Sequence, residues 1–184
     1  MPFMKLQEHC PMNSKIIIPS ILSFFVYFLV QVFVLKNLVL FDHAFCFLYI
    51  FYILLLPLEL RPIPLMSIAF ALGLAIDTFY DTLGFHTASL VAMAFVRNTW
   101  VKAIIPTGGY DENVQPSILN MGIGWYVAYT LPLVLLHHFI FFYIDSLGTG
   151  LYLSIVKRTL SSVAFVWILG IMVQMLFYKR RRGI

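Results

Sequence analysis

The sequence has few charged residues and few cysteines. Only 11% of its 184 residues are charged and 61% are hydrophobic, whereas an ordinary soluble domain has roughly 45–50% apolar and about 25% charged residues. The composition therefore excludes a soluble domain and predicts an integral membrane protein whose partner is the lipid bilayer and not nucleic acid. The two cysteines, Cys10 and Cys46, fall at opposite ends of the first apolar stretch, so no disulfide is expected between them.

Extended polar segments and enzyme motifs are also absent from the sequence. It contains no Gly-x-Ser-x-Gly, no His-Glu-x-x-His and no phosphate-binding loop, which are the usual sequence signs of hydrolases, metalloproteases and nucleotide-binding enzymes. We therefore expect no enzyme activity, no catalytic residue, no cofactor and no metal. The apolar stretches are continuous and do not alternate with polar residues, which favours membrane helices over a barrel.

Charged residues divide the chain into apolar stretches, and a membrane helix needs about 20 residues of this kind. The expected spans are Ile16–Leu35, His43–Leu58, Pro62–Ile76, Thr82–Val96, Met121–Ile144 and Thr159–Tyr178. The predicted fold class is thus an all-α membrane protein with six transmembrane helices over residues 16–178. A cytoplasmic segment over 1–15, a cytoplasmic loop over 97–120 and a basic cytoplasmic tail over 179–184 complete the expected organisation.

The positions of lysine and arginine predict the orientation, because cytoplasmic loops are enriched in both residues. If residues 62–96 form a helical hairpin, nine of the twelve cations lie inside and three outside, with both termini cytoplasmic. If the same residues form one long helix, the best division is seven to five. The first arrangement is favoured. The final basic run is expected to anchor this topology, with partner binding as the alternative; its residues are Lys179, Arg180, Arg181 and Arg182.

Asp77 and Asp81 are the most informative residues, because they place two carboxylates four positions apart at the end of an apolar stretch. A carboxylate within a membrane is costly and is therefore a candidate functional group. On a helix both would project from one face and could share a proton. The alternatives are a partner or ligand site, two hydrated groups near the membrane surface, or a cap for the turn into the next helix. Catalysis by an aspartyl pair is disfavoured, because it usually needs the two acids on different helices.

Other candidates lie close to this pair in the sequence. His86 is the one histidine that we expect to belong to the same site, while Gly73 and Gly84 are expected at packing or turn positions. His137 and His138 are adjacent within a predicted span, so their side chains point about 100° apart and cannot chelate one metal ion together. One of them is expected to hydrogen-bond to a neighbouring helix.

The order of these features resembles the MreD family of rod shape-determining proteins. The resemblance rests on Gly73-Leu74-x-x-Asp77 at the end of a third helix and Gly84-x-His86 at the start of a fourth. Further along, residues 110–117, Gly122-x-Gly124-Trp125 and His137-His138 are similar to one branch of the family. The resemblance covers roughly residues 41–144.

Membership of this family would imply a non-enzymatic scaffold in the bacterial cytoplasmic (inner) membrane. Such proteins belong to the elongasome, which builds the lateral peptidoglycan wall and maintains cell shape. The implied partners are MreC, MreB and the wall-synthesising transpeptidase and glycosyltransferase. The family is also similar in helix arrangement to the substrate-binding membrane subunits of energy-coupling-factor vitamin transporters, so a vitamin-capturing subunit is the alternative function.

Overall fold

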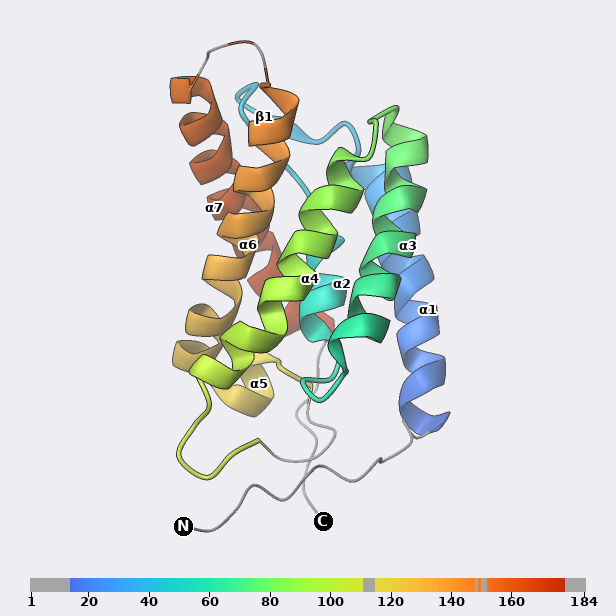
Figure 1. The fold of residues 1–184 in the computed structure, drawn as a ribbon, viewed down its shortest axis with the longest axis vertical. Coiled ribbons are helices and arrows are strands. Elements are labelled where there is room, and N and C mark those ends of the chain that lie inside the picture. Colours follow the sequence, from blue (N-terminus) through green and yellow to red (C-terminus); the bar gives the residue numbers. More distant parts are fainter. Residues whose placement is uncertain (1–13, 111–114, 148, 150–151, 178–184) are drawn as a thin grey trace.

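The computed structural model describes residues 14–110, 115–147, 149 and 152–177. They form a bundle of helices along one long axis, with a small β-hairpin at one end (Figure 1). The elements in chain order are α1 (Ser14–Val30), η1 (Gln31–Leu35), β1 (Val39–Leu40), β2 (Ala44–Phe45), α2 (Ile50–Leu55), α3 (Pro62–Tyr80), α4 (Phe85–Ala103), α5 (Ile118–Met121), α6 (Ile123–Asp145) and α7 (Tyr152–Phe177).

Four helical segments are long and apolar enough to cross a membrane. They are Ile17–Leu35, Pro62–Tyr80, Ile123–Asp145 and Tyr152–Leu176. Many of their large apolar side chains point away from the bundle, for example Phe33 and Leu176, which are 73% and 74% exposed. Such an apolar exterior suits lipid and not water. The protein is therefore an all-α membrane protein, as the composition predicted.

Helix α4 has the same length as α3, at 19 residues. It contains polar residues, including Arg97 and Lys102, and is not one of the four helices that are apolar enough to cross a membrane. It nevertheless packs between α3 and α6, with which it makes its main helix contacts (Figure 1). The helix continues to Ala103, so Arg97, expected at the start of a loop, is helical and fully buried.

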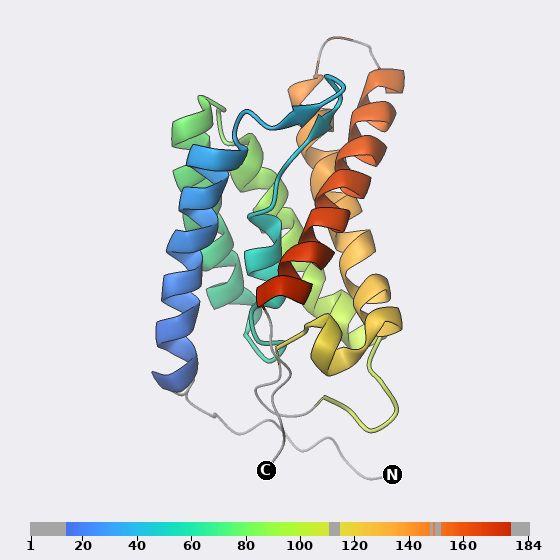
Figure 2. The same ribbon diagram turned by 180° about the vertical axis from the view of Figure 1, so that it is seen from behind.

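Residues 46–57 form a central segment that is buried along its whole length. The sequence predicted a helix over His43–Leu58, and this prediction is wrong for most of the range, because only Ile50–Leu55 is α-helical. The chain instead enters through the β-hairpin, where Val39 pairs with Phe45, and continues through turns into α2. Figure 2 shows this segment passing between the surrounding helices. A continuous apolar run does not distinguish a buried helix from a buried extended segment.

At the hairpin end, polar side chains bond to the backbone of the entering chain. Gln31 occupies the π-helical turn η1 and is fully buried. Its amide nitrogen donates to the Cys46 carbonyl at 2.8 Å, and its amide oxygen accepts from the Tyr49 N–H at 3.3 Å. Ser162 on α7 accepts from the Phe45 N–H at 2.9 Å. Since backbone groups within a membrane must find partners inside the protein, these bonds allow the chain to be non-helical here.

At the other end of the central segment, Tyr129 and Arg97 also bond to backbone groups of the chain. The Tyr129 hydroxyl donates to the Leu54 carbonyl at 2.7 Å and accepts from Arg97 Nε at 2.6 Å. Arg97 Nη2 donates to the carbonyls of Leu56 at 2.5 Å and Pro57 at 3.3 Å. The guanidinium thus lies at the C-terminal end of α2, where the helix dipole favours a positive charge.

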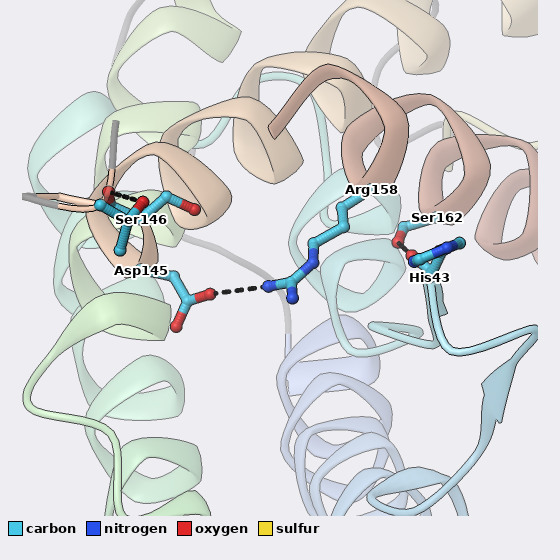
Figure 3. Close-up of polar contacts among 6 residues, drawn as sticks. His43, Asp145, Ser146, Arg158 and Ser162 are labelled. Atoms are coloured by element: carbon cyan, nitrogen blue, oxygen red, sulfur yellow. Dashed lines mark hydrogen bonds and ion pairs between the residues drawn. The ribbon is translucent and has the colours of Figure 1, made fainter. Parts of the chain in front are cut away.

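The hairpin end of the bundle also holds the α3–α4 turn and the connection from α6 to α7 (Figure 1). Here Arg158 of α7 and Asp145 of α6 form an ion pair at 3.2 Å, and the Ser162 hydroxyl donates to the His43 carbonyl at 3.4 Å (Figure 3). The connection from α2 to α3 and helix α5 lie at the opposite end. Asp77 is therefore at the hairpin end of the bundle.

Candidate functional site

Asp77 lies in the last turn of α3, and its carboxylate caps the beginning of α4. Oδ1 accepts from the His86 N–H at 3.0 Å and from the Thr82 hydroxyl at 2.5 Å. Oδ2 accepts from the Thr87 N–H at 2.9 Å and from the Thr87 hydroxyl at 2.5 Å. The first N–H groups of a helix have no partner within the helix, and the helix dipole favours a negative charge there. These four bonds offset the cost of burying Asp77, which is 4% exposed.

Gly73, one helical turn before Asp77, sets the distance between α3 and α4. A Cβ atom at this position would lie 2.5 Å from the Cα atom and 2.9 Å from the backbone nitrogen of Thr87. Backbone atoms cannot move aside as a flexible side chain can, so only glycine fits. The close approach brings the Thr87 N–H within reach of the Asp77 carboxylate. Gly73 and Asp77 thus act together, and Gly73 is at a packing position, as expected.

The α3–α4 turn uses two residues with positive φ. Asp81 ends α3 in the left-handed conformation at φ 55°, and its N–H donates to the Asp77 carbonyl. Gly84 precedes α4 at φ 90°, a conformation that favours glycine because a side chain would be strained there. Gly84 is therefore a turn residue, in agreement with the sequence-based expectation.

Asp77 and Asp81 do not form a carboxylate pair. Asp77 is buried beneath the turn, whereas the Asp81 side chain is exposed to the surroundings. The left-handed conformation of Asp81 takes its side chain off the helix face that carries Asp77. Of the alternatives considered, the capping role describes Asp77, and its oxygen atoms are occupied by donors within the chain.

His86 is the second residue of α4 and is fully buried. Its ring Nδ1 is 2.8 Å from the Tyr49 hydroxyl, which lies 2.9 Å from Nε2 of His137 on α6. A chain of two hydrogen bonds therefore joins α4, the central segment and α6. The sequence placed His86 beside Asp77 correctly, and predicted an interhelical contact for one residue of the His137–His138 pair. It did not predict that Tyr49 lies between His86 and His137.

His138 lies next to this chain but is not part of it. Its Nδ1 is 2.8 Å from the Val134 carbonyl of its own helix. The Phe47 ring packs among His86, His137 and His138, with ring centroids 5.0, 6.2 and 5.4 Å away. In the part of the chain that the structure describes, no set of three potential metal ligands is placed to hold an ion.

An apolar groove runs along the outer surface of α3 and α4, with a volume of about 590 Å³. Its lining includes Ala88 and Ala92 of α4 and Gly84, which precedes this helix; these small residues are spaced four positions apart. Phe70 of α3 and Phe95 of α4 are among its other lining residues. Small residues at this spacing let a neighbouring membrane helix approach closely. The groove therefore offers an apolar surface with small residues in its lining.

The sequence analysis did not identify several polar residues that organise the site. Gln31, Tyr49, Arg97 and Tyr129 are all fully buried and all bond to the central segment or belong to it. The available signal was their polarity within apolar stretches, since such residues in a membrane face the protein interior. The expected topology anchors Lys179, Arg180, Arg181 and Arg182 lie outside the described residues.

Comparisons with protein-family models, with curated proteins and with solved structures found no match to this chain.

Proposed function

We propose that this protein is a non-enzymatic membrane scaffold of the MreD type, which organises peptidoglycan synthesis along the side wall of a bacterial cell. The observation that carries the proposal is that Asp77 holds together the α3–α4 hairpin. All four of its bonds join the end of α3 to the turn and to the start of α4. A carboxylate used in this way builds a rigid surface and performs no chemistry.

The surface that this hairpin presents is the apolar groove along α3 and α4. Its proposed occupant is the single transmembrane helix of MreC, a partner implied by the family resemblance. The row of Gly84, Ala88 and Ala92 supports this occupant, because helix association in lipid depends on close packing of small residues. MreB and the wall-synthesising transpeptidase and glycosyltransferase would assemble around the same complex.

The proposed topology has six passes and places both termini in the cytoplasm. The four apolar helices, α4 and the central segment would each make one pass. In support, the connections alternate between the two ends of the bundle, with the hairpin, the α3–α4 turn and the α6–α7 connection at one end (Figure 1). That end would face outward from the bacterial inner membrane. The basic residues 179–182 would anchor the opposite side.

The packing gives less support to the alternative of a vitamin-capturing transporter subunit. Such a subunit needs a cavity with free polar groups, whereas Asp77 and His86 are 4% and 0% exposed. The centre of the bundle is filled by residues 46–57, all of which are buried. The arrangement thus favours an interaction surface over a ligand cavity.

The test is affinity purification of the tagged protein from bacterial membranes in mild detergent, with mass spectrometry of the bound proteins and small molecules. We expect MreC and wall synthases to co-purify with the unaltered chain. Ala88→Leu and Ala92→Leu, which fill the groove, should each reduce MreC recovery at least tenfold. Recovery of a stoichiometric small ligand together with paired ATPases would instead establish the transporter.

Ala164→Leu is the matched control, because Ala164 is exposed on α7 and lies away from the groove. It makes the same change in side-chain volume and should leave MreC recovery unchanged. Equal losses for the control and the groove variants would contradict binding in the groove. Membrane levels of each variant, measured in the same samples, separate lost binding from lost protein.

A further inference from the structure

We propose that His86, Tyr49 and His137 form a proton relay in the membrane-embedded part of this protein. The inference is independent of the scaffold function. It rests on two short contacts to one hydroxyl group: Tyr49 Oη is 2.8 Å from His86 Nδ1 and 2.9 Å from His137 Nε2. All three side chains are fully buried, so bulk water does not compete for these bonds.

The chemistry of a hydroxyl group between two imidazoles restricts where the protons are. Tyr49 has one proton to donate, so it donates to one ring nitrogen and accepts from the other. In the first arrangement it donates to His86 Nδ1 and accepts from His137 Nε2–H. Both rings then carry their proton on Nε2. In the second arrangement the directions reverse, and both rings carry their proton on Nδ1. The two neutral histidines must therefore share the same tautomer.

The outer nitrogen atoms of the chain are the two that do not face Tyr49. His86 Nε2 and His137 Nδ1 are buried and have no hydrogen-bond partner among the described residues. Buried polar atoms in proteins normally have a partner, and an unpartnered atom in a polar site is a place for an ordered water molecule or an incoming proton. Each end thus accepts a proton in one tautomeric arrangement and releases one in the other.

One transfer through the chain starts from the second arrangement. A proton binds to the lone pair of His86 Nε2, and the Nδ1 proton of His86 passes to the Tyr49 oxygen. The hydroxyl proton of Tyr49 passes to His137 Nε2, and the Nδ1 proton of His137 is released. One proton enters and one leaves, no bond other than N–H and O–H changes, and the chain is left in the first arrangement. The reverse transfer restores it.

The titratable groups around the chain come from α3 and α6. The Tyr80 ring packs against His86 at 4.8 Å between centroids, and Asp77 accepts the His86 backbone N–H. His138 lies 5.4 Å from His137 between ring centroids. The Asp77 carboxylate is the nearby negative charge that stabilises a transient positive charge on His86. The Tyr80 hydroxyl accepts from the Gln31 amide at 2.7 Å and is outside the relay.

The test is ¹⁵N NMR spectroscopy of the histidine-labelled protein in lipid nanodiscs at neutral pH. Single His→Gln variants assign the signals of the five histidines. We expect His86 and His137 to show equal tautomer fractions and to exchange between tautomers at one common rate. Opposite tautomers, unequal fractions, a permanently charged ring or a single tautomer without exchange would each overturn the relay.

Two tyrosine variants make the test specific. Tyr49→Phe keeps the ring and removes the hydroxyl, so the tautomer fractions of His86 and His137 should become unequal and the common exchange rate should be lost. Tyr80→Phe removes the hydroxyl from a ring that packs against His86 but is outside the chain, and the equal fractions should remain. Equal fractions and a common rate in Tyr49→Phe would overturn the proposal. If Tyr49→Phe fails to fold, the tautomer fractions and exchange rates of His86 and His137 in the unaltered protein still test the relay.

Discussion

Asp77 shows how hydrogen bonds stabilise a buried carboxylate within a membrane protein. The cost of removing a carboxylate from water is several kcal/mol unless hydrogen bonds replace the lost hydration. Asp77 obtains two bonds from the backbone and two from hydroxyl groups. Gly73 is the residue that lets those donors come close enough. The two residues are therefore coupled, although a full helical turn separates them.

The first prediction concerns the charge of Asp77. Asp77→Asn keeps the size of the side chain but replaces one acceptor oxygen by an NH₂ group that faces donors. We expect a loss of about 1–3 kcal/mol in the free energy of unfolding, because buried donors lose their partner. Asp81→Asn, at the exposed neighbouring position, should change it by less than about 0.5 kcal/mol. Reversible unfolding in mixed micelles measures both, and equal effects would contradict the capping role.

The second prediction concerns the contact at Gly73. Gly73→Ala puts a methyl group 2.5 Å from the Thr87 Cα atom, so the helices must separate. We expect a loss of about 1–3 kcal/mol, as for other overpacked sites. Gly124→Ala on α6 is the control, because a Cβ there meets no atom within 4 Å, and it should be neutral or slightly stabilising. Thermal unfolding of both variants in one detergent provides the comparison, and a neutral Gly73→Ala would disprove the close approach.

At the scale of elements, the sequence predicted α3 and α6 well and the central segment badly, and it placed the start of the last helix at Thr159, seven residues after α7 begins at Tyr152. The stretches Pro62–Ile76 and Met121–Ile144 correspond closely to α3 and α6. Long apolar runs are a strong signal because only a helix satisfies its own backbone within lipid. Residues 46–57 need not be helical throughout, because they are surrounded by protein and their backbone groups bond to side chains that are distant in the sequence. No local pattern reveals those distant partners.

The candidate site was also predicted only in part. Gly73, Asp77, Gly84 and His86 were identified because short motifs place them around one turn. Their roles required the structure, since the donors to Asp77 depend on how α3 and α4 pack. Tyr49 was not identified, because a single tyrosine in an apolar run resembles an ordinary core residue.

The third prediction concerns how the central segment is held. Tyr129→Phe removes the hydroxyl that donates to the Leu54 carbonyl and accepts from Arg97. A buried carbonyl and a buried guanidinium N–H then lose a partner, at a cost of about 2–4 kcal/mol. Tyr143→Phe on the same helix is the control, because Tyr143 is 47% exposed. Thermal midpoints in nanodiscs should fall for Tyr129→Phe alone, and similar midpoints for both variants would count against this bond.

At the scale of the whole molecule, the two ends of the bundle carry different connections. The exposed α3–α4 turn and the exposed end of α4 lie at opposite ends (Figure 1). Positions on each are open to a soluble reagent, since Asp81 and Lys102 are both exposed. The proposed topology assigns the first to the outside and the second to the cytoplasm.

The fourth prediction follows from this assignment. In a background with Cys10→Ser and Cys46→Ala, a membrane-impermeant maleimide should label Asp81→Cys in intact spheroplasts. Lys102→Cys should be labelled only after the membrane is opened. Labelling of both positions from the outside would exclude an odd number of passes between them, and with it the proposed passage of α4 through the membrane.

The hydrogen bonds of the central segment also have a consequence for biosynthesis. Residues 46–57 leave the ribosome before Arg97, Tyr129 and Ser162, whose side chains bond to this segment or to the chain entering it. Only six residues of the segment are α-helical, so most of its backbone groups would lack hydrogen-bond partners in lipid before these later residues are present. Its final placement must therefore follow the synthesis and packing of α4, α6 and α7. The second apolar stretch to be synthesised is thus among the last parts of the chain to reach its native position.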